Sequence, residues 1–599
     1  MPEHSEEMKQ IDPVEFANTM QDIATRSQKL MGDFMERQNL DGDNAESSQQ
    51  HLTDAFMALT NQMMHNPTKI VQAQIDLWQG YMDIWNRSTQ RWLGKDTDPA
   101  VQADQGDRRF RDEAWQENVV FDFIKQSYLL TSRWTQDLVG ETEGLDAKTQ
   151  QKVDFYTRQF VDAMAPTNFL MTNPEVLRTT METHGDNLVH GLQNLLEDLE
   201  RGKGKLSIRM TDPDAFEVGR NLATTPGKVV YQNDLMQLIQ YAPTTEKVYR
   251  RPLLIVPPWI NKFYILDMRE KNSFIRWAVS EGFTVFVVSW VNPGEELSRK
   301  SFEDYMLEGP LAALDAMKLA TGEDEANVIG YCIGGTLMAA TLAHMTAKKD
   351  ERIKSITFFT TMVDFEEAGE LGVFIDEEQL AALEEKMNKR GYLDGSEMAT
   401  TFNMLRANDL IWSFVVNNYL LGKDPFPFDL LYWNSDSTRM PAVMHSFYLR
   451  KMYQENKLIE PGALTLAGTP IDLTAIKTPT FMLSTKEDHI APWKSTYRAT
   501  QIYSGPIKFC LAGSGHIAGV VNPPSDKPKY GHYISSRRPK SPDKWLEGAS
   551  YHEGSWWPEW AKWMSRHGGG MVDARVPGDG KLKVIEDAPG SYVKLKTKA

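Results

Sequence analysis

The chain has 599 residues, of which 41% are hydrophobic and 25% are charged, and these proportions are typical of a folded protein rather than a disordered or fibrous one. Its formal net charge of −17 would repel a phosphate backbone, which argues against a nucleic-acid-binding protein. Two cysteines in the whole chain exclude a disulfide framework and a cysteine-rich zinc site.

The N-terminal residues are acidic and contain no apolar core, so no secretory signal is predicted there. No later stretch approaches the roughly 18 consecutive apolar residues that would span a bilayer. We therefore expect a cytoplasmic protein without a membrane span.

A helical pattern dominates the first part of the chain, which has few runs typical of strands. Val71, Ile75, Trp78, Met82 and Trp85 recur at spacings of three and four residues, which places them on one face of a helix. This stripe is interpreted either as packing between helices of an N-terminal domain or as a docking face for a partner or an apolar surface. The spacing does not separate the two interpretations.

From about Val229 onward, short apolar and β-branched runs alternate with segments of helix length. This alternation predicts βαβ units and a mostly parallel sheet that is buried on both faces. The chain is therefore divided into an all-helical N-terminal domain, residues 1–215, and an α/β domain, residues 216–599. The predicted strands are 253–256, 283–289, 327–331, 355–361, 480–484 and 507–511.

A long insertion separates the fourth and fifth predicted strands. Residues 364–460 are rich in helix formers, aromatic residues and turn signals. Insertions of this length in an α/β sheet are usually lids over the site, so a helical lid is predicted here. After the last strand, Gly568–Gly570 begins a polar segment that is expected to be a mobile tail.

The sequence Gly330-Tyr331-Cys332-Ile333-Gly334 matches the nucleophile elbow G-x-S-x-G, with cysteine in place of serine. Such a turn holds the nucleophile in a strained conformation at the carboxyl edge of the sheet. The helix that follows stabilises a thiolate and offers backbone N–H groups to a developing oxyanion. Cys332 is therefore predicted to be a nucleophile, the alternative being a small buried cysteine in a glycine-rich turn.

An acid and a histidine follow in the chain order expected of this elbow, each after a predicted strand. His516 would act as general base on Cys332, and Asp488 would fix the tautomer of His516 and stabilise the imidazolium. Glu487 is the competing acid and His489 the competing base, because both lie beside Asp488 on the same predicted loop.

The loop after the first strand, Pro257–Lys262, lies where the second oxyanion donor is expected. The candidate donors are the backbone N–H of Ile333 and that of Trp259 or Ile260. The other cysteine, Cys510, lies within a predicted strand and is interpreted as an inert packed thiol.

Cysteine rather than serine at the elbow favours acyl transfer from a thioester. Attack by a thiolate exchanges one thioester for another at little cost in free energy. The acyl-enzyme then stays activated, and transfer to an alcohol to form an ester is downhill. A cysteine hydrolase on this fold stays conceivable.

Together these residues resemble the class I polyhydroxyalkanoate synthases, the single-subunit bacterial polymerases of short-chain hydroxyacyl-CoA. The resemblance implies an α/β-hydrolase-like core with a lid subdomain. It implies that Cys332 carries the acyl chain, that His516 is its base, and that Asp488 assists His516 or activates the 3-hydroxyl of the substrate. The shared segments are Pro257–Asp267, Val288–Trp290, Gly330–Gly335, Asn408–Trp412, Pro427–Asn434, Glu487–Trp493, Gly513–Pro524 and Gly554–Trp560.

The resemblance also implies a substrate and a setting. The enzyme would polymerise short-chain (R)-3-hydroxyacyl-CoA, chiefly 3-hydroxybutyryl-CoA, into a polyester chain and release CoA, without a metal or an organic cofactor. It would form a homodimer on polyhydroxyalkanoate granules in the cytoplasm, beside other granule-associated proteins. The N-terminal domain would serve oligomer formation or granule association.

Two other interpretations stay open. One is a cysteine-nucleophile hydrolase on the same fold, either a polyester depolymerase or a thioesterase. The other is a granule-associated structural protein with an inactive site. The residues that contact CoA are not identified by the sequence, although Arg406 and Lys494 lie near the shared segments and are basic, as partners of its phosphates must be.

Overall fold

The computed structural model describes residues 25–26, 52–104 and 106–596, which form two compact units. Unit 1 comprises the chain up to residue 211 together with residues 406–426, and unit 2 comprises residues 212–405 and 427 onward. The division falls near the predicted domain boundary at 215, but it assigns 406–426, inside the predicted lid, to the N-terminal unit. The role of residues 364–460 as a lid stays a prediction.

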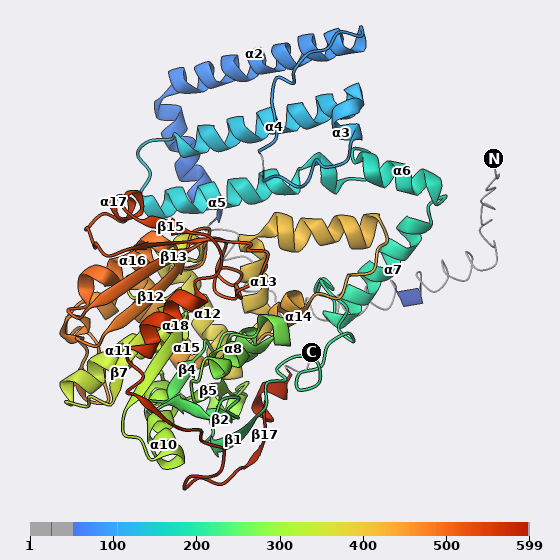
Figure 1. Ribbon diagram of the computed structural model, residues 1–599. Coiled ribbons are helices and arrows are strands. Elements are labelled where there is room, and N and C mark those ends of the chain that lie inside the picture. The colour runs from blue at the N-terminus through green and yellow to red at the C-terminus, as the bar shows by residue number, and fades with distance from the viewer. Residues whose placement is uncertain (1–24, 27–51, 105, 597–599) are drawn as a thin grey trace, which may run out of the picture. The chain divides into compact units, whose positions relative to one another are not determined.

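Helices α2, α4 and α5 of unit 1 lie side by side (Figure 1). The Trp134 indole N–H in α4 donates to the Ala73 carbonyl in α2 at 2.8 Å and ties the two helices together. α4 begins after Asn118, whose side chain caps the helix by accepting from two backbone N–H groups of the first turn. The longer helices of unit 1 include α2 (Pro67–Trp92), α4 (Val119–Gly140), α5 (Ala147–Ala163), α6 (Pro174–Glu182) and α7 (Asp186–Arg201), with the short α3 (Ala114–Glu117) between α2 and α4.

The apolar stripe of α2 faces outward from this helix layer. Its five side chains are between 40% and 64% exposed, with Trp78 the most exposed among them. The buried residues of α2 are Ile84 and Ser88, which lie on a different face of the helix. Packing within the N-terminal domain therefore leaves most of the stripe uncovered, although the Trp85 ring lies edge-on to that of Phe123 in α4, with centroids 6.1 Å apart.

Residues 406–426 are held against α7 by polar contacts within unit 1. The Asn187 side-chain amide donates to the Leu420 carbonyl at 2.7 Å, and the Tyr419 hydroxyl donates to Asp198 Oδ2 at 2.5 Å. Gly191 in α7 leaves no room for a Cβ, because the Tyr419 carbonyl lies directly against it. This close approach explains why a stretch so far along the chain joins the N-terminal helices.

Unit 2 is built on an 11-stranded sheet, ordered β15-β14-β13-β12-β7-β6-β4-β5-β2-β1-β17. The six predicted strands form its parallel centre, so the prediction of a mostly parallel α/β sheet is confirmed. They are β4 (Leu253–Val256), β5 (Val285–Trp290), β6 (Ala326–Tyr331), β7 (Ile353–Phe359), β12 (Thr480–Thr485) and β13 (Ile507–Ala512).

Antiparallel strands that the sequence pattern did not reveal extend both sides of this centre. On one side these are β2 (Met236–Tyr241), β1 (Gly227–Gln232) and β17 (Glu586–Asp587), and on the other β14 (His532–Ser535) and β15 (Ser550–His552).

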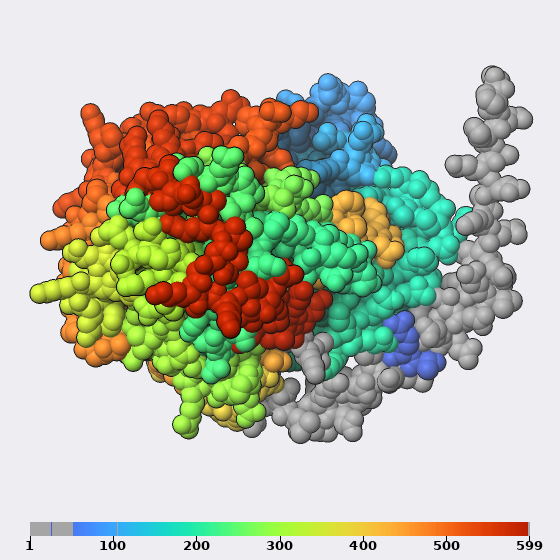
Figure 2. Space-filling view, turned by 60° about the horizontal axis from the view of Figure 1, so that its bottom comes forward, coloured from blue at the N-terminus to red at the C-terminus, as the bar shows by residue number. Residues whose placement is uncertain are grey.

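The C-terminal segment was expected to be a mobile tail, and that prediction is wrong for residues up to 596. β17 pairs with β1, and β16 (Met571–Asp573) pairs with β3 (Lys247–Tyr249). In Figure 2 the C-terminal segment, coloured red, runs across residues coloured green.

The sheet is buried on both faces because successive residues of its central strands enter different cores. In β4, Leu254 and Val256 belong to one core, whereas Leu253 and Ile255 belong to the other. α10 (Ala312–Thr321), α11 (Ile333–Ala347) and α16 (Trp493–Ile502) contribute to the first core, and α8 (Phe274–Ser280) and α18 (Trp557–Ser565) to the second.

The remaining helices of unit 2 are α9 (Phe302–Met306), α12 (Glu377–Arg390), α13 (Gly395–Leu405), α14 (Asp429–Ser435), α15 (Ala442–Tyr448) and α17 (Pro542–Glu547). In the part of the chain that the structure describes, every helix falls short of the length or the apolar character needed to cross a membrane.

Candidate active site

Cys332 lies at the sharp turn between β6 and α11. Its backbone has φ 52° and ψ −123°, a strained conformation for a residue with a Cβ. The strain is held by hydrogen bonds on both sides, since Cys332 N–H donates to the Phe359 carbonyl at 2.9 Å and its own carbonyl accepts from Gly335 N–H at 2.9 Å. The thiol is half-buried at the carboxyl end of the parallel strands. These are the features predicted from the elbow sequence.

The glycines around Cys332 are required by close packing. A Cβ on Gly330 would lie 2.6 Å from the Cα of Gly335, so strand and helix meet without space for a side chain. A Cβ on Gly334 would lie 2.6 Å from the Pro257 carbonyl oxygen. The first turn of α11 is thus pressed against the loop that follows β4, which brings that loop close to Cys332.

His516 and Asp488 meet at the same edge of the sheet. His516 Nδ1 and Asp488 Oδ2 are 2.7 Å apart, and both side chains are buried. The other carboxylate oxygen of Asp488 accepts from the backbone N–H groups of Ile490 and Ala491, each at 2.9 Å. Asp488 is therefore fixed as a hydrogen-bond acceptor that orients the imidazole and leaves its Nε2 for the thiol.

The competing residues on this loop are placed differently. Glu487 is exposed, and its backbone N–H donates to the Ser514 carbonyl at 3.1 Å. His489 is half-buried, and its carbonyl lies close to Gly369. The structure pairs Asp488, and not Glu487, with His516.

The surroundings of His516 favour its protonated form. Burial by itself lowers the pKa of His516, but the charges of Asp488 and Cys332 and hydrogen bonds to both side chains outweigh burial and raise the pKa from 6.5 to about 10. A proton taken from the Cys332 thiol is therefore held firmly on the imidazole. The Tyr331 hydroxyl supports the same loop by donating to the His516 carbonyl at 3.2 Å.

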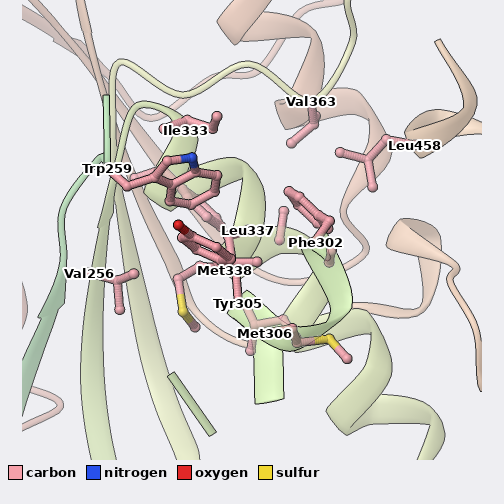
Figure 3. Packing of buried hydrophobic residues seen from close by; sticks show 14 of the residues in the cluster. Val256, Trp259, Phe302, Tyr305, Met306, Ile333, Leu337, Met338, Val363 and Leu458 are labelled. Atoms are coloured by element: carbon pink, nitrogen blue, oxygen red, sulfur yellow. The ribbon is translucent and has the colours of Figure 1, made fainter. Parts of the chain in front are cut away.

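The loop after β4 supplies the candidate oxyanion donors Trp259 and Ile260. Trp259 and Ile333 belong to one buried cluster with Leu337 and Val363, which Figure 3 shows from close by. The loop carbonyl of Pro257 accepts from the Trp290 indole N–H at 2.9 Å. The elbow and the loop are thus parts of one packed core, which gives their backbone N–H groups fixed directions.

Two tyrosines near the nucleophile were not identified from the sequence. The side chains of Tyr448 and Tyr453 are joined by a hydrogen bond, and both interact electrostatically with Cys332. Burial raises the pKa of both hydroxyls, so they are neutral hydrogen-bonding groups. They follow no motif in the sequence, and only the course of α15 and of the π-helical segment η9 (Leu449–Gln454) that continues it brings them near Cys332.

The remaining predicted residues lie apart from this cluster. Cys510 is fully buried in β13, and burial raises the pKa of its thiol, as for an inert packed cysteine. Arg406 is paired with Asp409 in unit 1, and Lys494 is paired with Asp543. Neither pairing supports the suggested contact with CoA. Over the ranges that the structure covers, His, Cys, Asp and Glu side chains form no group of three or more that could hold a metal ion.

Two family models match the chain. The first is described as the N-terminus of poly-beta-hydroxybutyrate polymerase (PhaC) and matches residues 106–278. The second is described as the alpha/beta hydrolase fold and matches residues 252–523, in agreement with the predicted fold.

Curated relatives match nearly the whole chain. A poly(3-hydroxyalkanoate) polymerase of Methylorubrum extorquens is 51% identical over 91% of this chain and 90% of its own length. The poly(3-hydroxyalkanoate) polymerase subunit PhaC of Rhizobium meliloti is 51% identical over 89% of this chain and 87% of its own length. The corresponding subunit of Cupriavidus necator is 44% identical over 82% of this chain and 83% of its own length.

Proposed function

The chain belongs to the poly(3-hydroxyalkanoate) polymerase family, and from that premise we propose that it polymerises (R)-3-hydroxyacyl-CoA, chiefly 3-hydroxybutyryl-CoA, through an acyl chain carried on Cys332. The observation that carries the assignment of residues is the strained backbone at Cys332, which presents its thiol beside the buried pair His516 and Asp488. The polymerisation itself follows from the family.

In the first half-reaction the thiol proton of Cys332 passes to His516 Nε2, and the sulfur attacks the thioester carbonyl. The oxyanion that forms accepts hydrogen bonds from Ile333 N–H and from a backbone N–H of the loop after β4. When this intermediate collapses, the bond to the CoA sulfur breaks, and CoA leaves with the proton that His516 held. The product is an acyl thioester on Cys332.

In the second half-reaction the 3-hydroxyl of an incoming unit or of the chain end attacks that thioester. His516 takes the hydroxyl proton, an ester bond forms, and the proton returns to the sulfur that leaves. Asp488 acts through His516, because one of its carboxylate oxygens is bonded to His516 and the other to two backbone N–H groups. These contacts support that role over direct activation of the substrate hydroxyl.

The function is tested with purified protein and (R)-3-hydroxybutyryl-CoA, by recording thiol release together with turbidity from insoluble polymer. We expect both signals from the wild type, neither from Cys332→Ala, and both from the matched control Cys510→Ala. Thiol release with soluble hydroxy acid and no turbidity would identify a thioesterase on the same fold. CoA release that survived in Cys332→Ala would refute the nucleophile assignment.

The exposed stripe of α2 supports association with the polyester granule in the cytoplasm. The side chains of Trp78 and Trp85 are 64% and 60% exposed, on one face with three further apolar residues. An apolar face of this kind gains free energy when it covers an apolar polymer surface. It would also hold the enzyme near the growing chain and near other granule-associated proteins.

Granule association is tested with the double variant Trp78→Gln/Trp85→Gln and amorphous polyester particles. We expect the variant to stay in the supernatant under conditions in which the wild type sediments with the particles, while CoA release from soluble substrate is retained. Equal sedimentation of both proteins would refute the role of the stripe.

The proposed homodimer is tested separately by light scattering, where a mass equal to that of one chain would contradict it.

A further inference from the structure

The end of α14 and the residues just after it bind the backbone of the loop that follows β4. The Trp433 indole N–H donates to the Lys262 carbonyl at 2.8 Å, and Asn261 forms an antiparallel bridge with Ser437. Thr438 ends the stretch. We call residues 433–438 the clasp, because they contact this loop at several successive positions.

Thr438 holds the part of the loop that carries the candidate oxyanion donors. Its hydroxyl is buried and lies 2.5 Å from the Trp259 carbonyl oxygen and 2.6 Å from the Ile260 carbonyl oxygen, so its one hydrogen is shared between two successive carbonyls in a bifurcated hydrogen bond. A single hydroxyl thereby fixes the planes of two adjacent peptide groups.

The orientation of one peptide group decides where its N–H points. The peptide between Trp259 and Ile260 is trans, so its C=O and its N–H point in opposite directions. Because Thr438 binds the Trp259 carbonyl, the Ile260 N–H is turned away from Thr438. The same loop is pressed against the first turn of α11 at Gly334, beside Cys332.

We infer that Thr438 is a positioning residue, which directs the Ile260 N–H at the oxyanion formed on the carbonyl that Cys332 attacks. This inference rests on the proposed function. It also decides between the two loop candidates, because the peptide that Thr438 orients through the Trp259 carbonyl carries the N–H of Ile260. Fixed donors of this kind stabilise the transition state without reorganising during the reaction.

A buried ion pair keeps the loop and the clasp together independently of Thr438. Lys262 Nζ lies 2.7 Å from Asp436 Oδ1, and the Tyr264 hydroxyl donates to Asp436 Oδ2 at 2.9 Å. The side chains of Lys262 and Asp436 are only 3% and 9% exposed. Removal of the Thr438 hydroxyl alone therefore leaves the loop attached to the clasp, but the peptide between Trp259 and Ile260 is then free to rotate.

The test compares Thr438→Val, which keeps the shape of the side chain and removes the hydroxyl, with Thr438→Ser, which keeps the hydroxyl. For each protein, kcat and KM are measured from CoA release, and the rate of Cys332 alkylation by iodoacetamide is measured separately. Alkylation forms no oxyanion, so it reports the thiol and its base but not the oxyanion donors.

For Thr438→Val we expect kcat to fall about 10- to 100-fold, which is less than the loss of a whole oxyanion donor, with KM and the alkylation rate unchanged. Thr438→Ser should keep most of the wild-type kcat. A wild-type kcat in Thr438→Val would refute the inference alone, whereas no CoA release from the wild type would refute the proposed function with it. A parallel loss of kcat and alkylation would assign Thr438 to the fold of the site and would also overturn the inference.

Discussion

Helices α11 and α2 both carry apolar residues, but those of α11 are buried whereas the apolar stripe of α2 is exposed to solvent. All residues of α11 from Ile333 to Met345 are buried, since this helix lies in the core directly after Cys332. The buried residues of α2 are Ile84 and Ser88, and its tryptophans Trp78 and Trp85 are mostly exposed. An apolar pattern therefore predicts a face that needs a partner, and only the neighbouring elements decide whether that partner belongs to the fold.

The same contrast holds for residues of one chemical type, so it can be tested with matched pairs of a buried and an exposed group. The buried member carries structure or catalysis because its contacts cannot be replaced by water. Substitution of the exposed member should change stability or activity only slightly.

The largest effect is expected at the adjacent acids Asp488 and Glu487. Asp488→Asn should lower kcat by about three to four orders of magnitude, because the amide no longer holds the imidazole in its working tautomer. The exposed Glu487→Gln should stay close to the wild type. The measurement is CoA release under saturating substrate, and equal losses in the two variants would show that Asp488 has no special role.

The next largest effect is expected on the free energy of unfolding, which should depend on the buried Trp560 far more than on the exposed Trp78. Trp560 is fully buried and donates from its indole N–H to Thr357 Oγ1 at 2.9 Å, so Trp560→Ala should lower the free energy of unfolding by about 3–5 kcal/mol. Trp78 is 64% exposed, and Trp78→Ala should change it by no more than about 0.5 kcal/mol. Urea denaturation followed by circular dichroism measures both changes. A large loss in Trp78→Ala would mean that the stripe of α2 is covered in solution.

A buried and an exposed ion pair allow the same comparison, with smaller expected changes in the free energy of unfolding. Asp436→Asn leaves Lys262 buried without its counter-charge and should lower the free energy of unfolding by about 3 kcal/mol. Glu143→Gln removes the partner of Lys69 in a pair whose side chains are 90% and 49% exposed, and the cost should be below about 1 kcal/mol. The same denaturation experiment serves for both. Similar losses of unfolding free energy in the two variants would contradict the burial of Lys262 and Asp436.

The pH dependence of stability tests the charge of the buried site. Because the pKa of His516 rises from 6.5 to about 10 on folding, the protonated imidazole stabilises the fold fully below pH 6.5. This contribution is lost between about pH 6.5 and 10, at up to about 1.4 kcal/mol per pH unit. Asp488→Asn should flatten that part of the curve, since it removes the carboxylate that faces His516. An unchanged slope in this variant would show that the pair does not raise the pKa.

Much of unit 2 could be predicted from the sequence because the signals are local. Six apolar runs predicted the central parallel strands, and β4 begins and ends at the predicted residues. The elbow around Cys332 was recognisable because a strained turn requires glycines at fixed positions in the chain. The places of Asp488 and His516 after successive strands followed from the rule that parallel strands end at one edge of a sheet.

The edges of the sheet and the outward face of α2 could not be predicted in this way. β17 pairs with β1 across most of the length of unit 2, and a two-residue strand leaves almost no periodic signal. The attachment of residues 406–426 to α7 depends on Gly191 meeting the Tyr419 carbonyl, a contact between distant parts of the chain.

The sequence by itself determined the class of fold, the sharp turn at Cys332 and the order of the candidate triad, because the strands and turns that carry them each leave a local pattern in the chain. Tertiary structure decided that Asp488 rather than Glu487 reaches His516, that the stripe of α2 is exposed, and that Thr438 binds the loop at Trp259. The physical reason is the same in each case. Burial and hydrogen bonding depend on which surfaces meet, and that is settled only when the whole chain has packed.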